Sequence, residues 1–381
     1  MKIKVGICGL PNIGKSTLFN ALARKSVAQA ENYPFCTIEP NIAPITVPDK
    51  YLLELGTLAK SEKAIPAVME FIDVAGLVAG ASRGEGLGNR FLATIRECNA
   101  ICHLIRYFED PDIIHVDGRV SPKDDAEVVN LELVLADTAH IERRLEKTTC
   151  RGEERLALEK LLLELQKGIP ARAVGLTPDE EFSIKSMGLL TLKPVIYVFN
   201  VDEADFLLAR DDVLASARDI FNNIQYCDPG RDMYTVVSAK VEAAVSALDD
   251  PNTQKEYFKS LGVELEAGEA LEELMSYSVL PNMLLKLLDL FIVYTGPGVP
   301  PERSKTLKSH LFSKISTPTT IQLAGRLHGE IERGFIRAEV IPAPLLLQFE
   351  SYNDAKETGT VRTEGKDCIL EDNDVVLIKW K

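Results

Sequence analysis

Short apolar runs recur along the first part of the chain, separated by segments of helical or loop character. The runs that predict strands are Ile3–Cys8, Ala67–Ile72, Ala100–Ile105, Val195–Asn200 and Tyr234–Val237. Strands that alternate with helices are typical of a mostly parallel sheet with helices packed on its faces. The pattern therefore predicts an α/β fold for this part of the chain.

The spacing of apolar positions changes between residues 123 and 193. Mostly apolar side chains recur there at intervals of three and four residues, which is typical of helices that pack along one face. They lie on either side of a break at residues 148–152: Leu131, Val134, Thr138, Ile141 and Leu145, then Leu158, Leu161, Leu162 and Leu165. We expect an antiparallel helical hairpin, a coiled-coil domain, inserted into the sheet domain.

The character of the chain changes again after Leu280. An apolar run at Leu287–Tyr294 precedes a Gly-Pro turn cluster at 296–301, and strand patterns return at Ile336–Ile341 and Val375–Trp380. Residues 299–314 are loop-like and cannot be assigned to an element. We therefore expect three domains: a discontinuous α/β domain of residues 1–122 and 194–285, the helical insertion at 123–193, and a small α+β domain at 286–381.

A Gly-rich loop follows the first predicted strand directly and leads into a helical pattern. Its sequence is GLPNIGKST, from Gly9 to Thr17. In such a loop the backbone N–H groups curl around phosphate oxygens, Lys15 reaches the β- and γ-phosphates, and the Ser16 hydroxyl binds Mg²⁺. The sequence therefore predicts a nucleotide-binding P-loop protein, whose loop residues are Asn12, Ile13, Gly14, Lys15, Ser16 and Thr17.

Two further segments fit the needs of a Mg²⁺-dependent phosphate site. Asp73 closes a predicted strand, and in the DxxG pattern it would hold Mg²⁺ while the Gly76 N–H senses the γ-phosphate. Thr37 lies between the two motifs and could complete the Mg²⁺ shell as a switch residue, although a buried threonine in a turn is the alternative. The glycine-rich residues 78–89 then suggest a second switch, or else a plain surface loop.

The loop that reads the base departs from the guanine-specific pattern Asn-Lys-x-Asp. After the strand at 195–199 the chain has Asn200, Val201 and, in place of the Asp that accepts two guanine donors, Glu203. The longer side chain displaces the carboxylate, and losing a buried partner is costly, so we expect guanine specificity to be lost. Ser238 and Ala239 still match the loop that usually backs the base.

Composition and charge limit the other possibilities. The 381 residues carry a formal net charge of −14, so any nucleic-acid contact must be local. Seven cysteines form no CxxC pair, which favours reduced thiols, and no apolar run is long enough for a membrane span. We expect a cytoplasmic protein with no membrane partner. Local basic clusters occur at the hairpin tip, interleaved with glutamates, and in the C-terminal domain.

Taken together, the motifs resemble those of the Obg-like ATPases of the YchF family, within the translation-factor-related P-loop proteins. The resemblance rests on PNIGKST, NYPFCTIEPN, DVAGLVAGASRGEGLGN, NVDE, ERGFIRAEV and EGKDCILEDNDVV, and it extends from residue 3 to 381. It implies a nucleotide domain, an inserted coiled coil, a C-terminal TGS domain of ubiquitin-like fold, hydrolysis of ATP in preference to GTP, and association with ribosomes, ribosomal RNA or protein translation partners.

The resemblance also implies roles for individual residues. Leu77 stands where many relatives of this class have a water-orienting glutamine, so intrinsic hydrolysis should be slow. His115 is the implied substitute for positioning water, and an ordinary loop histidine is the equal alternative. Asn12 resembles a residue that helps bind a monovalent cation such as K⁺. Residues 303–320 depart from the family pattern, which leaves the arrangement of the first TGS strands open.

The leading hypothesis is a slow, Mg²⁺-dependent ATPase whose nucleotide state changes its affinity for a ribosome or a translation factor. Two other functions remain open. One is a GTPase of the Obg type, which the Ser238-Ala239-Lys240 loop would allow. The other is a scaffold that nucleotide stabilises and in which hydrolysis is incidental, since an apolar Leu77 cannot orient water.

Overall fold

The computed structural model describes residues 2–30, 41–74, 87–110, 119–208, 210–248, 250–262, 271–296 and 306–381. Contacts within the chain group it into two compact units. The larger unit comprises residues 3–45 and 70–279, and the C-terminal unit comprises residues 1–2, 46–69 and 280–381. No helix in the described ranges has the length and apolar character required to cross a membrane.

The larger unit is built on a sheet of six strands in the order β2-β4-β1-β5-β6-β7. β1 pairs in parallel with β5, β5 with β6, and β6 with β7. Every residue of β5 and β6 is buried, as expected for central strands covered on both faces. The strands are β1 Ile3–Cys8, β2 Ile42–Thr46, β4 Val68–Asp73, β5 Ala100–Arg106, β6 Val195–Asn200 and β7 Met233–Val237.

The α/β fold predicted from the apolar runs is confirmed, and all five predicted strands are present to within one residue at each end. Helix α1 packs against α9, and α4 and α8 pack against strands of the sheet. The helices of this unit are α1 Lys15–Ala30, α3 Leu87–Arg96, α4 Pro122–Leu145, α5 Gly152–Leu165, α6 Pro178–Ile184, α7 Glu203–Leu208, α8 Arg210–Asn223, α9 Ala239–Ser246 and α10 Pro251–Ser260.

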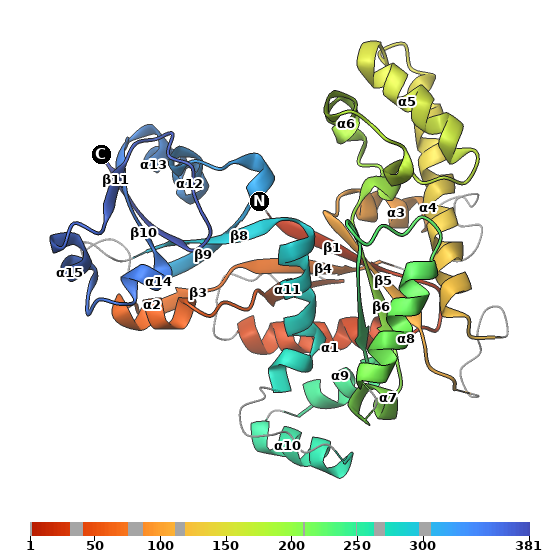
Figure 1. The fold of residues 1–381 in the computed structure, drawn as a ribbon, viewed down its shortest axis with the longest axis horizontal. Coiled ribbons are helices and arrows are strands. Elements are labelled where there is room, and N and C mark those ends of the chain that lie inside the picture. Colours follow the sequence, from red (N-terminus) through yellow and green to blue (C-terminus); the bar gives the residue numbers. More distant parts are fainter. Residues whose placement is uncertain are drawn as a thin grey trace. The chain divides into compact units, whose positions relative to one another are not determined.

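The predicted helical hairpin consists of α4 and α5, which end and begin on either side of the expected break (Figure 1). Their contact is apolar, and Ile141, Leu158 and Leu161 are fully buried in it. Arg144 donates to both oxygens of Glu154 at 2.7 and 2.8 Å, which joins the two helices near the tip. The basic side chains at the tip are therefore partly used within the hairpin.

Helix α4 is tied to the rest of the unit through the buried side chain of Asp137, in the second half of the helix. Its carboxylate accepts hydrogen bonds from the backbone N–H groups of Leu190 and Thr191, at 3.0 and 2.8 Å, and from the Thr191 hydroxyl at 2.9 Å. Arg96 at the end of α3 forms an ion pair with the same carboxylate at 2.8 Å. One aspartate thus links α4, α3 and the segment that leads into β6.

The C-terminal unit has its own six-stranded sheet, in the order β11-β10-β12-β8-β9-β3. Phe291, Val293, Leu323 and Val340 are among the residues of its apolar core. Its elements are α2 Leu52–Leu58, β3 Lys63–Ile65, β8 Leu290–Thr295, β9 Thr306–Ser313, α12 Thr320–Leu327, α13 Gly329–Arg333, β10 Phe335–Pro342, α14 Ala343–Leu346, α15 Tyr352–Glu357, β11 Arg362–Glu364 and β12 Asp374–Trp380, and helix α11 Ser276–Leu287 leads into it.

Two features of the C-terminal unit differ from the sequence expectation. Residues 306–313, expected within a loop, form β9, which pairs antiparallel with β8 and parallel with β3. Residues 46–69, expected within the nucleotide domain, belong to this unit by their contacts. The sequence pattern does not indicate this strand because the inward-facing position between Leu307 and Leu311 is Ser309, a buried polar residue that interrupts the apolar alternation. Its hydroxyl accepts from the Ala67 N–H at 2.7 Å.

Candidate nucleotide-binding site

The Gly-rich loop leaves the carboxyl end of β1 and enters α1, where a parallel sheet usually binds its ligand. Gly14 has a φ of +88°, and an added Cβ would lie 2.3 Å from the Asn200 side-chain nitrogen. Gly9 is equally confined, because an added Cβ would lie 2.4 Å from the Leu104 carbonyl oxygen. Asn12 also has a positive φ, of 61°. The loop is therefore held in the curled form that turns backbone N–H groups toward an anion.

Lys15 and Asp73 interact electrostatically at this end of the sheet. The Lys15 side chain starts the first turn of α1 and is buried, with 8% of its surface exposed. Burial lowers the pKa of its ammonium group, and the charge of Asp73 opposes that shift. Burial likewise raises the pKa of the Asp73 carboxyl, and Lys15 opposes it. The DxxG aspartate and the phosphate-loop lysine are thus brought together, as their motifs require.

The oxygen donors around this pair suit a hard divalent cation. Asp73 Oδ1 is buried and has no hydrogen-bond partner within the described part of the chain. The hydroxyl residues Ser16 and Thr17 are exposed at the start of α1. Carboxylate and hydroxyl oxygens, completed by water and phosphate oxygens, are the ligands that Mg²⁺ prefers in nucleotide sites. Ser16 and Asp73 therefore fit the metal that the sequence motifs predict.

The side chain of Asn200 connects the phosphate loop to the loop after β7. Its amide nitrogen donates to the Ile13 carbonyl at 2.8 Å, and its oxygen accepts from the Ala239 N–H at 2.9 Å. Asn200 is 3% exposed. Both polar atoms of this amide are therefore used within the protein, and Asn200 organises the site that sequence reasoning assigned it to contact.

The other residues predicted to contact the base lie close to Asn200 in the structure. Val201 is buried, and its N–H donates to the Val237 carbonyl at 2.9 Å. Ser238 is fully buried and caps α9, so it supports Ala239 rather than facing solvent. Glu203 is the first residue of α7 and is half-buried. The carboxyl ends of β6 and β7 thus present Glu203 and the start of α9 beside the phosphate loop.

Sequence reasoning missed one residue of this site, Tyr257 on α10. Its hydroxyl donates to Glu203 Oε1 at 3.0 Å, and Lys240 on α9 forms an ion pair with Glu203 Oε2. The two bonded residues are 54 positions apart, and Tyr257 belongs to no motif. No signal in a single sequence indicates this contact.

Three of the predicted site residues, Thr37, Gly76 and His115, lie outside the described residues. Their assigned roles as Mg²⁺ ligand, γ-phosphate sensor and catalytic histidine stay predictions.

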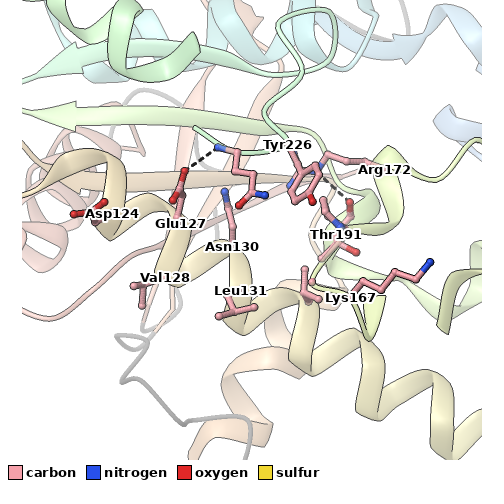
Figure 2. A pocket seen from close by; sticks show the side chains of 13 residues that line it. Asp124, Glu127, Val128, Asn130, Leu131, Lys167, Arg172, Thr191 and Tyr226 are labelled. Carbon is pink, nitrogen blue, oxygen red and sulfur yellow. Dashed lines mark hydrogen bonds between the residues drawn. The ribbon is translucent and has the colours of Figure 1, made fainter. Parts of the chain in front are cut away.

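A cavity of about 450 Å³ in the larger unit is lined by none of the described site residues (Figure 2). It is bordered by α4 and by the segments that precede β6 and β7, whereas the phosphate loop follows the carboxyl end of a parallel strand. Arg172 lines it, but its guanidinium binds both oxygens of buried Asp232 at 2.9 and 3.0 Å. Asp124 and Glu127 add negative charge. These groups do not favour a phosphate, so this cavity offers no alternative to the Gly-rich loop as the candidate nucleotide site.

Two family models match the chain. The first is described as a 50S ribosome-binding GTPase and covers residues 4–135, which include the phosphate loop and Asp73. The second is the C-terminal YchF model, described as a protein of unknown function (DUF933), and covers residues 311–381.

Full-length relatives extend the match to the whole chain. A protein of Haemophilus influenzae named ribosome-binding ATPase YchF is 41% identical, over 100% of this chain and 99% of its own length. A Bacillus subtilis protein of the same name is 38% identical over 100% of both chains. The solved YchF GTPase of Schizosaccharomyces pombe is 30% identical with a TM-score of 0.79, covering 99% of this chain and 98% of that one.

Proposed function

Because the chain belongs to the YchF family of P-loop proteins, we propose that it is a Mg²⁺-dependent ATPase that works as a slow nucleotide-state switch. The observation that carries the proposal is that Lys15 and Asp73 lie within electrostatic reach of each other beside a phosphate loop in its curled form. A buried lysine side chain, and a buried carboxylate oxygen with no hydrogen-bond partner among the described residues, are what the phosphates of a nucleotide and its metal would need there.

The protein's own groups would act mainly by binding and charge stabilisation. The backbone N–H groups of residues 12–17 and the Lys15 ammonium would hold the β- and γ-phosphates, and Lys15 would stabilise charge that develops on the transferred group. Ser16 and Asp73 would hold Mg²⁺, which when bound neutralises phosphate charge. Leu77 cannot orient water, so hydrolysis without help should be slow.

The residues outside the described ranges complete the proposal. Thr37 and Gly76 would respond to the γ-phosphate, so that hydrolysis releases both switch segments. His115 would position the attacking water near neutral pH. Asn12, which lies within the described phosphate loop, would help bind K⁺.

We also propose ATP as the preferred substrate and a ribosome or translation factor as the partner. Glu203 replaces the guanine-reading aspartate, and both of its oxygens bind protein donors. The names of the bacterial relatives support ribosome binding, and with it a cytoplasmic location and contacts with ribosomal RNA or protein partners. GTP hydrolysis remains the second candidate, because the first family model and the fission-yeast relative carry GTPase names.

Equilibrium binding of ATP and GTP in the presence of Mg²⁺ tests the site, with Lys15→Ala compared to the wild type. Losing the charge-assisted contacts of Lys15 should weaken ATP binding about tenfold to a hundredfold and abolish turnover. Lys167→Ala removes an exposed lysine paired with Glu164 and should change neither quantity, so it is the matched control. Unchanged ATP affinity and turnover in Lys15→Ala would show that the site assignment is wrong.

Ribosome binding separates the switch from a scaffold. A switch must bind ribosomes with different affinity in its ATP and ADP states, because a nucleotide without differential effect shifts no equilibrium. Equal affinity of the two states in a pelleting assay would favour the scaffold.

A further inference from the structure

The carboxylate of Glu203 is held from two sides by side chains of two other helices. Tyr257 on α10 donates its hydroxyl to Oε1 at 3.0 Å, and the ammonium of Lys240 on α9 pairs with Oε2. Glu203 is the first residue of α7, so three helices meet at this carboxylate. Both oxygens are therefore directed toward protein donors.

Both donors stay protonated at neutral pH. Burial, together with the hydrogen bond to Glu203, raises the pKa of the Tyr257 hydroxyl to about 12. The hydrogen bond and charge of the same carboxylate raise the pKa of Lys240. The Tyr257 hydroxyl and the Lys240 ammonium therefore both remain donors to Glu203 at neutral pH.

The position of Tyr257 is fixed by the way α10 is attached. Its neighbour Phe258 is fully buried and meets the Tyr257 ring edge-on, with ring centroids 5.5 Å apart. Gln254 donates to the Leu248 carbonyl, just beyond the end of α9, at 2.7 Å. At its first turn α10 is capped by Asp250, which accepts from the Thr253 N–H at 3.1 Å. The hydroxyl of Tyr257 is thus presented to Glu203 from an anchored helix.

We propose that Tyr257 is a positioning residue for base recognition, which holds the Glu203 carboxylate so that it does not accept the two donors of guanine. A carboxylate that reads guanine must direct both oxygens at N1–H and N2–H₂ together. Here that geometry would require Glu203 to give up its bond with Tyr257 and its pair with Lys240. Adenine presents no such pair of donors, so its binding does not require the carboxylate to be released. This inference rests on the proposed preference for ATP.

The two contacts to Glu203 differ in how strongly they hold its carboxylate. The side chain of Lys240 is 77% exposed, and an exposed ion pair is screened by water and salt. The Tyr257 hydrogen bond is half-buried and comes from a side chain with little freedom. We therefore expect Tyr257 to hold Glu203 more firmly than Lys240 does.

The test is the ratio of GTP to ATP dissociation constants in the purified full chain with Mg²⁺. Tyr257→Phe removes only the hydroxyl, and it should shift the ratio toward GTP by about threefold to tenfold. Tyr234→Phe is the matched control, because its hydroxyl also bonds a charged side chain, that of Arg218 at 2.8 Å, without touching Glu203. The control should leave the ratio unchanged.

A double-mutant cycle distinguishes positioning from a general effect on structure. In a Glu203→Ala background, Tyr257→Phe should no longer change the ratio, since the group it positions is absent. If the shift persists there, or if Tyr257→Phe alone leaves the ratio of an ATP-preferring wild type unchanged, this inference fails while the proposed function stands. If the wild type prefers GTP, the proposed preference and this inference both fail.

A second variant covers the case in which Tyr257→Phe does not fold. Lys240→Met releases the other oxygen and should shift the ratio in the same direction, by less. The measurement is made at low ionic strength, where the exposed pair is least screened, and an unchanged ratio in a folded Lys240→Met protein would then overturn the inference.

Discussion

The buried amide of Asn200 joins two of the loops that surround the nucleotide site. Because one atom donates to Ile13 and the other accepts from Ala239, its removal leaves two backbone groups without partners. The contact also lies against Gly14, whose missing side chain makes room for it. At the scale of single residues, the shape of the phosphate loop therefore depends on a side chain 187 positions later in the chain.

Asn200→Ala should lower the free energy of unfolding by about 2–4 kcal/mol, since each unpaired buried backbone group costs about 1–3 kcal/mol. Urea unfolding followed by circular dichroism measures the change. Asn223→Ala removes an exposed amide that donates to the Asp219 carbonyl and should stay within about 0.5 kcal/mol of the wild type. A loss in Asn200→Ala no larger than in Asn223→Ala would contradict the bridging role.

The sequence predicts most of the residues of the candidate site, but it does not predict the side-chain contacts that hold them in place. The spacing of Lys15, Asp73 and Asn200 after apolar strands indicates one edge of a sheet, and the structure brings Lys15 and Asp73 together there. The hydrogen bond between Asn200 and Ala239 depends on how α9 packs, and the hydrogen bond between Tyr257 and Glu203 depends on how α10 packs. Side-chain partners set by tertiary packing leave no periodic trace in one sequence.

At the scale of elements, the helical hairpin depends on a polar anchor as well as an apolar seam. Asp137→Ala should destabilise the larger unit by about 3–5 kcal/mol. The substitution removes the ion-pair partner of the largely buried Arg96 guanidinium. It also removes the acceptor of three further hydrogen bonds, from Leu190 and Thr191.

Chemical denaturation of Asp137→Ala checks this value against Asp124→Ala, on the same helix. Asp124 pairs with Arg119, but both side chains are more than half exposed, so its loss should cost less than about 1 kcal/mol. Equal losses in the two variants would mean that the Asp137 anchor contributes no more than a surface pair.

The strands that the sequence predicted are those with continuous apolar runs, such as β6. β9 has the buried Ser309 in its inward-facing row, and β3 spans only Lys63–Ile65, so neither produces a recognisable alternation. Both are stabilised by neighbours distant in sequence. Elements that depend on such pairing are those that periodicity alone cannot find.

At the scale of the whole molecule, each compact unit contains a histidine that stays neutral; His103 is buried and His310 is partly buried. Burial lowers the pKa of His103 on β5 and of His310 on β9 to about 3, against an ordinary value of 6.5. The unfolded chain therefore takes up protons below pH 6.5 that the folded chain does not. This contribution to stability is full above pH 6.5 and is lost as the pH falls toward 3.

As the pH falls from 7.5 to 5, the free energy of unfolding of the wild type should decrease by about 2 kcal/mol more than that of His103→Gln. Only the wild type has a histidine at position 103 that takes up a proton on unfolding. Unfolding free energies at the two pH values measure it. The variant is compared with the wild type at each pH because the partly buried carboxyls Asp49 and Asp73 have raised pKa values. Their protonation stabilises both folded proteins as the pH falls, and this contribution cancels in the comparison. A difference that stays constant with pH would show that His103 is not neutral in the folded chain.

The membership of residues 46–69 in the C-terminal unit has a consequence for the order in which the chain is made. Ala67 bonds to Ser309, 242 positions later, so this segment is synthesised long before its partner strand exists. At ordinary elongation rates the delay is roughly ten to fifty seconds. Throughout that interval the apolar side chains of α2, Leu52 and Leu55, have no core to enter. The nascent chain should therefore expose the apolar side chains of α2 until the strands of the C-terminal unit have been synthesised. We expect chaperones that bind apolar segments early in translation to bind it.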